Sequence, residues 1–263
     1  MNPSLVSIIV ATKNEQKNIK RCLSSCQKQA YKKMEIIVVD NFSEDKTVEI
    51  AKKFTRKIFL KGPERSAQRN LGAQKAKGEF LLFVDADMQL TKNLIMDCLS
   101  YKSGVVSIPE KIPHLAFWSK CRDFEKSLYA NDNLISAPRF FKKNLFVKLK
   151  GYNKNLYAAE DWDLSQRLKK LDITPAHCQS FLIHHEGPLS LPELMKKKFY
   201  YGRNLKHYVK KYPKNSLSYI LRPTFFKNYK KIILHPFLSM GMFTLKTLEY
   251  ISAASGFIWG YLR

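Results

Sequence analysis

Short apolar runs alternate with amphipathic stretches along the first ninety residues of the chain. The runs 6–11 and 34–40 are rich in β-branched residues, and each ends at polar or acidic positions. Such runs are typical of strands buried on both faces, as in a parallel sheet. Between them, apolar residues recur at helical spacing, namely Ile19, Cys22, Leu23 and Cys26. This order predicts a βαβ unit.

The run 80–87 is the centre of the predicted domain, because five apolar residues stop abruptly at two carboxylates, Asp85 and Asp87. Side chains two residues apart on a strand point to the same side. Open α/β sheets bind ligands at the carboxyl ends of their strands. Two carboxylates held in this way suit a divalent cation that also contacts phosphate oxygens. The alternative is a polar turn that closes the strand.

Further strands are predicted at 57–60, 105–108 and 181–183, and helices at 47–54, 66–77, 115–131 and 193–212. Alternating strands and helices predict an α/β fold with a doubly wound, mostly parallel sheet. Asp40 and Asp85 end two successive central strands, so we expect them at one edge of that sheet. The sequence lacks GxGxxG and GxxxxGK[ST], which excludes a dinucleotide fingerprint and a P-loop.

Two later clusters could also carry chemistry. Glu160, Asp161 and Asp163 begin a predicted helix, where carboxylates commonly cap N–H groups and offset the macrodipole. His184 and His185 follow a predicted strand, and a histidine pair beside acids is metal-ligand material. Two exposed loop histidines are the alternative.

The net charge of the chain indicates the kind of partner that the protein binds. Lys and Arg outnumber Asp and Glu by 46 to 22, a formal net charge of +24, which predicts a polyanionic partner: a phosphate-rich ligand, an anionic membrane or a nucleic acid. The five cysteines form no CxxC pair, which favours reduced thiols. The N-terminus has no basic head, so we interpret it as a strand and expect the protein on the cytoplasmic side.

The carboxyl-terminal region differs in composition from the rest. The helix 193–212 interleaves lysines with aromatic residues, and Lys246 and Glu249 divide the apolar stretch 232–262 into uncharged runs of 14 and 13 residues. A membrane-spanning helix needs about 18 or more such residues. We therefore predict a catalytic domain at 1–190 and a helical segment at 191–263 that lies in the membrane interface. The alternative is that the tail packs on the catalytic domain.

Taken together, these segments resemble the family 2 glycosyltransferases, which are inverting nucleotide-sugar enzymes with the A-type, Rossmann-like fold. The resemblance covers roughly residues 4–210 and depends on the order of five segments: 7–15, 35–47, 69–80, 85–87 and 160–161. It implies a nucleotide-sugar donor, either a UDP-sugar or a GDP-sugar, and Mg²⁺ or Mn²⁺ as the cofactor.

The resemblance also implies nucleotide contacts. Asp40 would accept from a base N–H group, and Thr12 with Glu15 would hold the base or the ribose. Arg65 or Arg69 would complete the base pocket or contact phosphate, for which the guanidinium fork is well suited.

The same resemblance implies the metal and catalytic residues. Asp87 would bind the metal directly, and Asp85 would bind the metal or the ribose. The metal would neutralise the leaving diphosphate. Asp161 would be the general base that takes the acceptor hydroxyl proton. His184 or His185 would add a ligand or a diphosphate contact.

Segment 85–89 is similar to the metal segment of polyprenyl-phosphate sugar synthases, in which a Gln, here Gln89, can join the two aspartates. Those enzymes use a lipid phosphate that needs no base, so the pair Glu160 and Asp161 favours a hydroxyl acceptor instead. We expect a metal-dependent inverting transfer to a lipid-linked acceptor at the cytoplasmic membrane face. The alternatives are a polyprenyl-phosphate (dolichyl-phosphate) sugar synthase and a basic nucleic-acid-binding protein. We expect no nucleic-acid partner, because acidic strand ends repel phosphate unless a metal intervenes.

Overall fold

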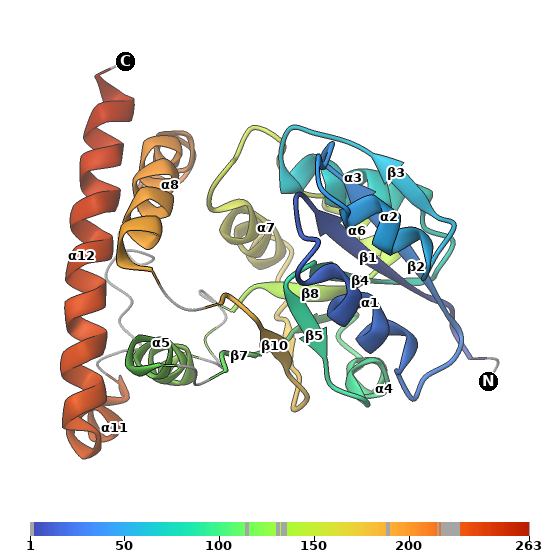
Figure 1. Ribbon diagram of the computed structural model, residues 1–263, viewed down its shortest axis with the longest axis horizontal. Coiled ribbons are helices and arrows are strands. Elements are labelled where there is room, and N and C mark those ends of the chain that lie inside the picture. The colour runs from blue at the N-terminus through green and yellow to red at the C-terminus, as the bar shows by residue number, and fades with distance from the viewer. Residues whose placement is uncertain are drawn as a thin grey trace.

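A seven-stranded sheet organises the larger part of the protein (Figure 1). The computed structural model describes residues 3–113, 116–129, 132, 136–187, 190–214, 216 and 227–262. The sheet order is β3-β2-β1-β4-β8-β6-β9, and a three-stranded sheet of order β5-β10-β7 lies beside it.

The strands of the large sheet are β1 (Val6–Thr12), β2 (Met34–Asp40), β3 (Ile58–Leu60), β4 (Phe80–Asp85), β6 (Val105–Ser107), β8 (Pro138–Lys142) and β9 (Ala176–His177). Strands β3, β2, β1 and β4 are all parallel, and β9 is parallel to β6. Strand β8 runs antiparallel to both β4 and β6. The predicted mostly parallel α/β sheet is therefore confirmed, with one reversed strand at β8.

Two apolar clusters cover the two faces of the sheet, because alternate residues of each strand point to opposite sides. One cluster combines Ile8 and Val10 with α1 (Ile19–Gln27), α2 (Thr47–Lys52) and α4 (Leu94–Ser100). The other combines Ile9 and Phe83 with α3 (Arg65–Lys75), α6 (Lys143–Lys148) and α7 (Glu160–Lys169). Burial on both faces explains why β1 and β4 are continuous apolar runs in the sequence.

The small sheet consists of β5 (Met88–Leu90), β7 (Glu110–Lys111) and β10 (Leu182–His184). Strand β10 pairs antiparallel with β5, so that His184 lies opposite Met88 and Ile183 opposite Gln89. This pairing brings the segment after β4 next to the histidine pair, almost one hundred residues later in the chain.

A separate helical layer contains α5 (Phe117–Leu128), α8 (Leu191–Lys211), α11 (Tyr229–Leu234) and α12 (Pro236–Tyr261). Figure 1 shows α12 as the outermost element, alongside α8. The same helix also packs along the side of α5, through Cys121, Phe124 and Leu128. Helix α12 is continuous over 26 residues, so Lys246 and Glu249 do not interrupt it. None of the helices in the described parts of the chain is long and apolar enough to cross a membrane.

Helix α5 differs from the prediction in its extent and in the domain that it contacts. The predicted helix 115–131 is observed as α5, and its predicted ends at 115, 130 and 131 lie outside the described residues. Helix α5 comes from the predicted catalytic domain, yet it packs with α12 through Cys121 and Met242. All five cysteines are free and buried, as expected for reduced thiols.

Candidate functional site

The central strands end side by side at the carboxyl edge of the sheet. Thr12 at the end of β1 lies in register with Asp40 of β2, and Ala11 lies in register with Asp85 of β4. The predicted placement of Asp40 and Asp85 at one edge is therefore confirmed. Gln68 of α3 donates to the backbone oxygens of Thr12 and Val39, at 2.9 and 2.7 Å, and so ties the ends of β1 and β2 together.

Arg69 lies at the centre of the acidic groups at this edge. Its side chain is 1% exposed, and its Nη2 lies 2.7 Å from Asp85 Oδ1. Its Nη1 lies 3.5 Å from Asp161 Oδ1 and 3.6 Å from Glu160 Oε1. This buried guanidinium is shared among three carboxylates, and the expected contact of Arg69 with nucleotide stays a prediction.

Asp85 is neutralised by two arginines. Arg139, in β8, lies 3.3 Å from Asp85 Oδ2 and places its other Nη 2.7 Å from Glu110 Oε1. Burial by itself would raise the pKa of Asp85, but Arg69 and Arg139 hold it well below its usual range. Both oxygens of Asp85 face guanidinium groups, and the expected use of Asp85 as a ligand of metal or ribose stays a prediction.

Asp87 is the carboxylate of this pair that has no arginine partner among the described residues. Its Oδ2 lies 3.1 Å from His184 Nε2, while its Oδ1 is buried and has no hydrogen-bond partner among the described residues. A buried carboxylate oxygen without a donor is costly unless a further group binds it. Mg²⁺ is commonly bound by one or two carboxylates together with substrate phosphates and water. Asp87 therefore fits a divalent ion, although the described residues hold no cluster of three or more metal-ligating side chains.

The two histidines have different neighbours, which the sequence could not decide. His184 Nδ1 lies 3.1 Å from Glu110 Oε2, so the ring bridges Glu110 and Asp87. Burial would lower the pKa of His184, but contacts with these two acids raise it to about 9. His185 Nε2 instead lies 3.0 Å from Gln89 Oε1. The roles of both histidines and of Gln89 as ligands stay predictions.

The acidic pair at the start of α7 divides into a buried and an open carboxylate. The Glu160 side chain is 5% exposed and lies 3.2 Å from Arg65 Nη2, while the Asp161 side chain is 28% exposed. Burial raises the pKa of Glu160, although Arg65 opposes the shift. Asp161 is therefore the member of the pair that an acceptor could reach, and its role as base stays a prediction.

Asp163 has a structural role, but through side-chain partners and not through the N–H capping that was considered for this cluster; no side-chain cap bond is present among the described residues at the start of α7. Its side chain is fully buried, with Arg167 Nη2 at 2.7 Å and Lys211 Nζ at 2.6 Å. The Tyr212 hydroxyl donates to it at 2.9 Å. Asp163 thus joins α7 to the end of α8, and Asp161 is left for another purpose.

The remaining predicted nucleotide residues surround the strand ends. Asp40 is fully buried and accepts from the Ser43 amide at 2.7 Å and from its hydroxyl at 2.5 Å, which orders the loop after β2. Thr12 Oγ1 is buried without a hydrogen-bond partner among the described residues. Burial raises the pKa of half-buried Glu15, and repulsion from the charge of Asp87 raises it further. Arg65 keeps 42% of its side chain exposed beside Glu160. Their nucleotide contacts stay predictions.

Sequence reasoning assigned no role to Arg139, Glu110 or Arg122. Arg139 lies within an apolar strand, and Glu110 comes soon after one. A charged residue at such a position could have indicated a buried ion pair. Arg122 lies on α5, 2.9 Å from Glu186 and 3.0 Å from Glu249, and nothing in its local sequence predicts these partners.

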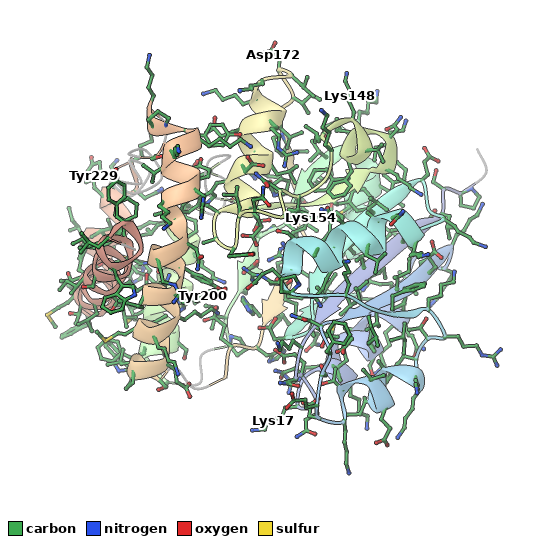
Figure 2. All side chains as sticks on the ribbon, turned by 90° about the horizontal axis from the view of Figure 1, so that it is seen from above. Lys17, Lys148, Lys154, Asp172, Tyr200 and Tyr229 are labelled. Carbon is green, nitrogen blue, oxygen red and sulfur yellow. The ribbon has the colours of Figure 1, made fainter. Side chains whose placement is uncertain are left out.

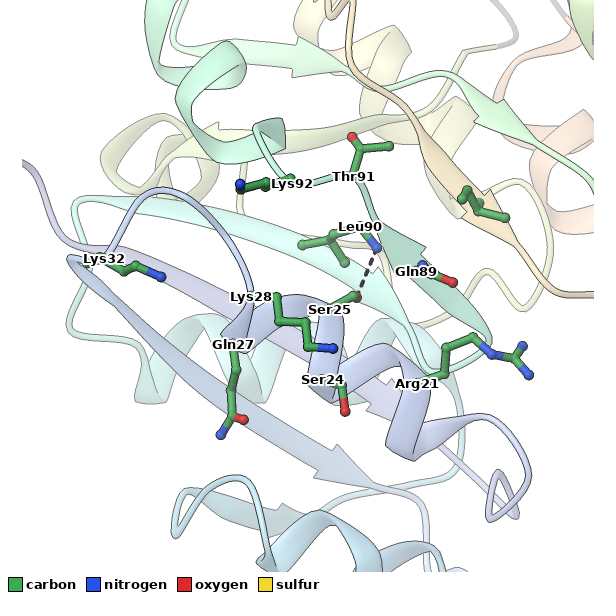
Figure 3. A pocket seen from close by; sticks show the side chains of 11 residues that line it. Arg21, Ser24, Ser25, Gln27, Lys28, Lys32, Gln89, Leu90, Thr91 and Lys92 are labelled. Carbon is green, nitrogen blue, oxygen red and sulfur yellow. Dashed lines mark hydrogen bonds between the residues drawn. The ribbon is translucent and has the colours of Figure 1, made fainter.

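A basic groove of about 770 Å³ lies between α1 and β5 (Figure 3). Its lining includes Arg21, Lys28, Lys32 and Lys92. The groove shares Gln89 with the site but is not lined by Asp87 or Asp161. It lies beside the acidic centre and does not contain it.

A mixed α/β sheet flanked by helices, with its acids gathered at the carboxyl edge, defines a fold of the A-type glycosyltransferase kind. Residues 7–103, a little over a third of the chain, match the family model described as Glycosyl transferase family 2. Relatives in the sequence comparison are also named as glycosyltransferases, and together these matches support a glycosyltransferase.

The curated relatives match parts of the chain to different extents. The poly(ribitol-phosphate) beta-N-acetylglucosaminyltransferase TarS of Staphylococcus aureus is 37% identical over 106 residues, which are 36% of this chain and 18% of TarS. An uncharacterized glycosyltransferase of Methanocaldococcus jannaschii, MJ1057, is 27% identical over 243 residues, covering 79% of this chain and 83% of that protein. The chain thus spans less than a fifth of TarS.

Two solved structures share the fold. The mannosyltransferase PcManGT from Pyrobaculum calidifontis, in complex with GDP-Man and Mn²⁺, superposes with a TM-score of 0.66 at 17% identity, covering 97% of this chain and 87% of that one. S. aureus TarS 1–349 in complex with UDP-GlcNAc gives 0.53 at 18% identity, covering 93% and 90%. At these identities the likeness shows the fold alone.

Proposed function

We propose that this protein is a metal-dependent inverting glycosyltransferase that moves a sugar from a nucleotide-diphosphate sugar to an acceptor hydroxyl. One observation carries the proposal. Asp87 has one oxygen without a hydrogen-bond partner among the described residues, and Asp161 is 28% exposed. Both belong to one connected cluster of charges at the carboxyl edge of the sheet. Each does a different task in such a reaction.

The donor would bind across the ends of β1 and β2. Thr12 Oγ1 and half-buried Glu15 offer groups for the base or ribose, and Arg65 has a partly exposed guanidinium for phosphate. The fold neighbours crystallised with UDP-GlcNAc and GDP-Man support a nucleotide-sugar donor of one of these two kinds.

The metal would be held by Asp87 Oδ1, with His184 fixing the other oxygen of the same carboxylate. When bound, Mg²⁺ or Mn²⁺ supplies positive charge to the diphosphate as it leaves. The neighbour in complex with Mn²⁺ supports this choice of cofactor.

Asp161 would act as the general base. Its carboxylate takes the proton of the acceptor hydroxyl while that oxygen forms a bond to the anomeric carbon. The bond from this carbon to the diphosphate oxygen breaks on the opposite face, so the configuration inverts. Arg69 and Glu160 position Asp161 without touching the acceptor.

We further propose a lipid-linked acceptor at the cytoplasmic membrane face, on the strength of the basic carboxyl-terminal helices. A polyprenyl-phosphate sugar synthase is the second candidate, and the segment 85–89 favours it. Transfer assays with a lipid-linked hydroxyl acceptor and with a polyprenyl phosphate distinguish the two, because only the first acceptor requires Asp161.

A thermal-shift panel tests the proposal as a whole. UDP, GDP and their sugars are each added with Mn²⁺ or with a chelator. A ligand that binds only the folded state stabilises it by about 2.7 kcal/mol at a hundred times its dissociation constant. We expect one nucleotide to raise the Tm, and Mn²⁺ to increase the shift. A protein that no nucleoside diphosphate stabilises, with or without metal, would contradict the proposal.

A further inference from the structure

Helix α12 and the adjacent helix α11 present a long apolar face to solvent. Six large side chains on it are more than half exposed: Ile233, Phe237, Met240, Phe243, Ile251 and Ile258. On α12 they share one side of the helix and form a stripe, in which the exposed Thr244 and Thr247 lie between Phe243 and Ile251. Both threonine hydroxyls donate to carbonyl oxygens of their own helix. At 1.5 Å per residue, the 26 residues of α12 extend over about 39 Å. We call this stripe the outward face.

The charged residues of α12 lie on the opposite side of the helix. Lys246 and Glu249 are 8% and 4% exposed and are its two charged positions. Lys246 Nζ lies 2.6 Å from Glu125 of α5. Glu249 lies 3.0 Å from Arg122 and 3.3 Å from Lys198 of α8. The outward face of α12 therefore carries no charge at all, which the sequence alone did not reveal.

Close packing fixes which side of α12 faces outward. A Cβ at Gly202 of α8 would lie 2.0 Å from the Ala253 backbone oxygen, and one at Gly256 would lie 2.1 Å from the Phe199 oxygen. The two helices are in backbone contact, so α12 cannot rotate its apolar stripe inward without losing both this contact and the buried ion pairs.

We propose that the outward face of α12 and α11 docks on an anionic lipid surface, with the helix axis parallel to the membrane. Exposed apolar faces of this length mark interaction sites in soluble folds. An amphipathic helix that lies in the bilayer interface combines such a face with basic flanks.

Charge complementarity selects lipid as the occupant. Residues 191–263 contain 14 Lys and Arg but only two acids, Glu193 and Glu249. Glu249 is buried, while Lys230 and Lys231 beside the stripe are exposed. Basic residues near an anionic surface add attraction to the apolar term. The stripe also lies on the outermost helix, where a flat surface can reach it (Figure 1). Figure 2 looks along α12 and shows it at the edge of the molecule.

Flotation with liposomes tests this docking directly. The full chain is mixed with vesicles of phosphatidylcholine, alone or with phosphatidylglycerol, and the bound fraction is measured. We expect binding to the anionic vesicles, weakened but not abolished by high salt, because salt screens only the electrostatic part.

Two variants with matched chemistry separate the outward face from general surface effects. Phe243→Glu with Ile251→Glu changes side chains that are 51% and 56% exposed on the stripe. Met96→Glu with Val147→Glu changes side chains that are 52% and 63% exposed on the α/β domain. We expect the first pair to lower the partition coefficient by about tenfold or more, since burial of apolar area is lost. The second pair should bind like the parent.

Circular dichroism and Tm establish that both variants fold. The proposal is overturned if the parent does not float with anionic vesicles, or if both pairs of substitutions bind alike. It is also overturned if sedimentation shows a dimer that only the Phe243 and Ile251 substitutions dissociate, because a second copy of the chain would then cover the face.

Discussion

At the scale of single residues, Arg69 explains how so many acids can gather at one edge of the sheet. Its buried guanidinium lies between Asp85 and the pair Glu160 and Asp161. The ring of Tyr152 covers it at 5.1 Å. A buried charge is tolerated only when it is paired. Arg69 thus links β4 to α7 and fixes the position of the proposed base.

The first prediction concerns Asp161. Replacing it with Asn keeps the size of the side chain but removes its capacity to accept a proton. We expect kcat to fall by about a hundredfold or more, the usual effect of losing a general base. Donor binding, measured by the nucleotide-induced Tm shift, should stay as in the parent.

Asp172→Asn is the matched control, because this exposed carboxylate lies beyond the end of α7, far from the strand ends (Figure 2). It should leave turnover unchanged. If Asp161→Asn instead unfolds the protein, the carboxylate has a structural role like that of Asp163.

The second prediction separates the two aspartates that follow β4. Asp87→Asn should abolish the Mn²⁺-dependent part of nucleotide binding and leave the Tm of the ligand-free protein nearly unchanged. Asp85→Asn should instead destabilise the fold by about 3–5 kcal/mol, because two buried arginines lose their partner. Chemical denaturation and metal titration measure the two effects. Equal loss of stability in both variants would show that Asp87 is also structural.

At the scale of elements, the contact between α12 and its neighbours combines close glycine packing with buried ion pairs. Arg122, Lys198 and Lys246 all meet Glu249 from three helices. Burial lowers the pKa of Lys198 to about 8, although Glu249 opposes this shift. Arg122 also contacts Glu186, which lies 3.6 Å from His184. The helical layer is therefore connected to the site through charged side chains.

The third prediction follows from that arrangement. Glu249→Gln leaves three buried cations short of one negative charge, so we expect a loss of about 3–5 kcal/mol in the free energy of unfolding. Glu193→Gln changes an exposed residue of α8 and is the control. It should change the free energy of unfolding by less than about 0.5 kcal/mol. Denaturant titration of both variants gives the comparison. A Glu249→Gln variant as stable as the parent would show that the cations lose charge or become hydrated.

At the scale of the whole molecule, α12 belongs to the folded structure on one side and is exposed on the other. Met242 and Leu245 join Cys121, Phe124 and Leu194 in a buried cluster. The alternative that the tail packs on the predicted catalytic domain is thus realised by one face of α12, which contacts α5, while the other face is exposed. Contact with membrane by the exposed face stays a proposal.

The fourth prediction addresses this dual role. Deleting residues 227–263 should uncover the apolar sides of α5 and α8, because Met242 and Leu245 no longer cover them. We expect a lower Tm and increased binding of an apolar dye, while the sheet core, which contains none of these residues, keeps its strands. Circular dichroism and dye fluorescence report the two parts. A truncated chain with the parent's Tm and no dye binding would contradict the packing described.

The sequence by itself determined β1, β2, β3, β4 and β6 of the large sheet and the edge at which its acids lie, but it did not predict β8 or β9. Runs such as 6–11 and 80–85 are apolar without interruption because both faces of β1 and β4 are covered, and this pattern is local to each run. Asp85 and Asp87 follow a predicted strand, and Asp161 lies at the start of a predicted helix. Their places in the fold could therefore be predicted from neighbouring residues. The resemblance to the A-type fold rests on the same motifs, and the solved structures PcManGT and TarS 1–349 share that fold.

The tertiary structure decided which partner each charge meets. Arg69 and Arg139 neutralise Asp85 from positions 16 and 54 residues away. The imidazole of His184 contacts the Asp87 carboxylate, whereas His185 reaches Asp87 through its backbone N–H. The sequence also did not predict that Lys246 and Glu249 point inward. Helix α12 is apolar on most sides, so only its contacts with α5 and α8 decide which side is buried. Such choices depend on contacts between distant segments, and the free energy of burying a charge is settled only when its partner is in place.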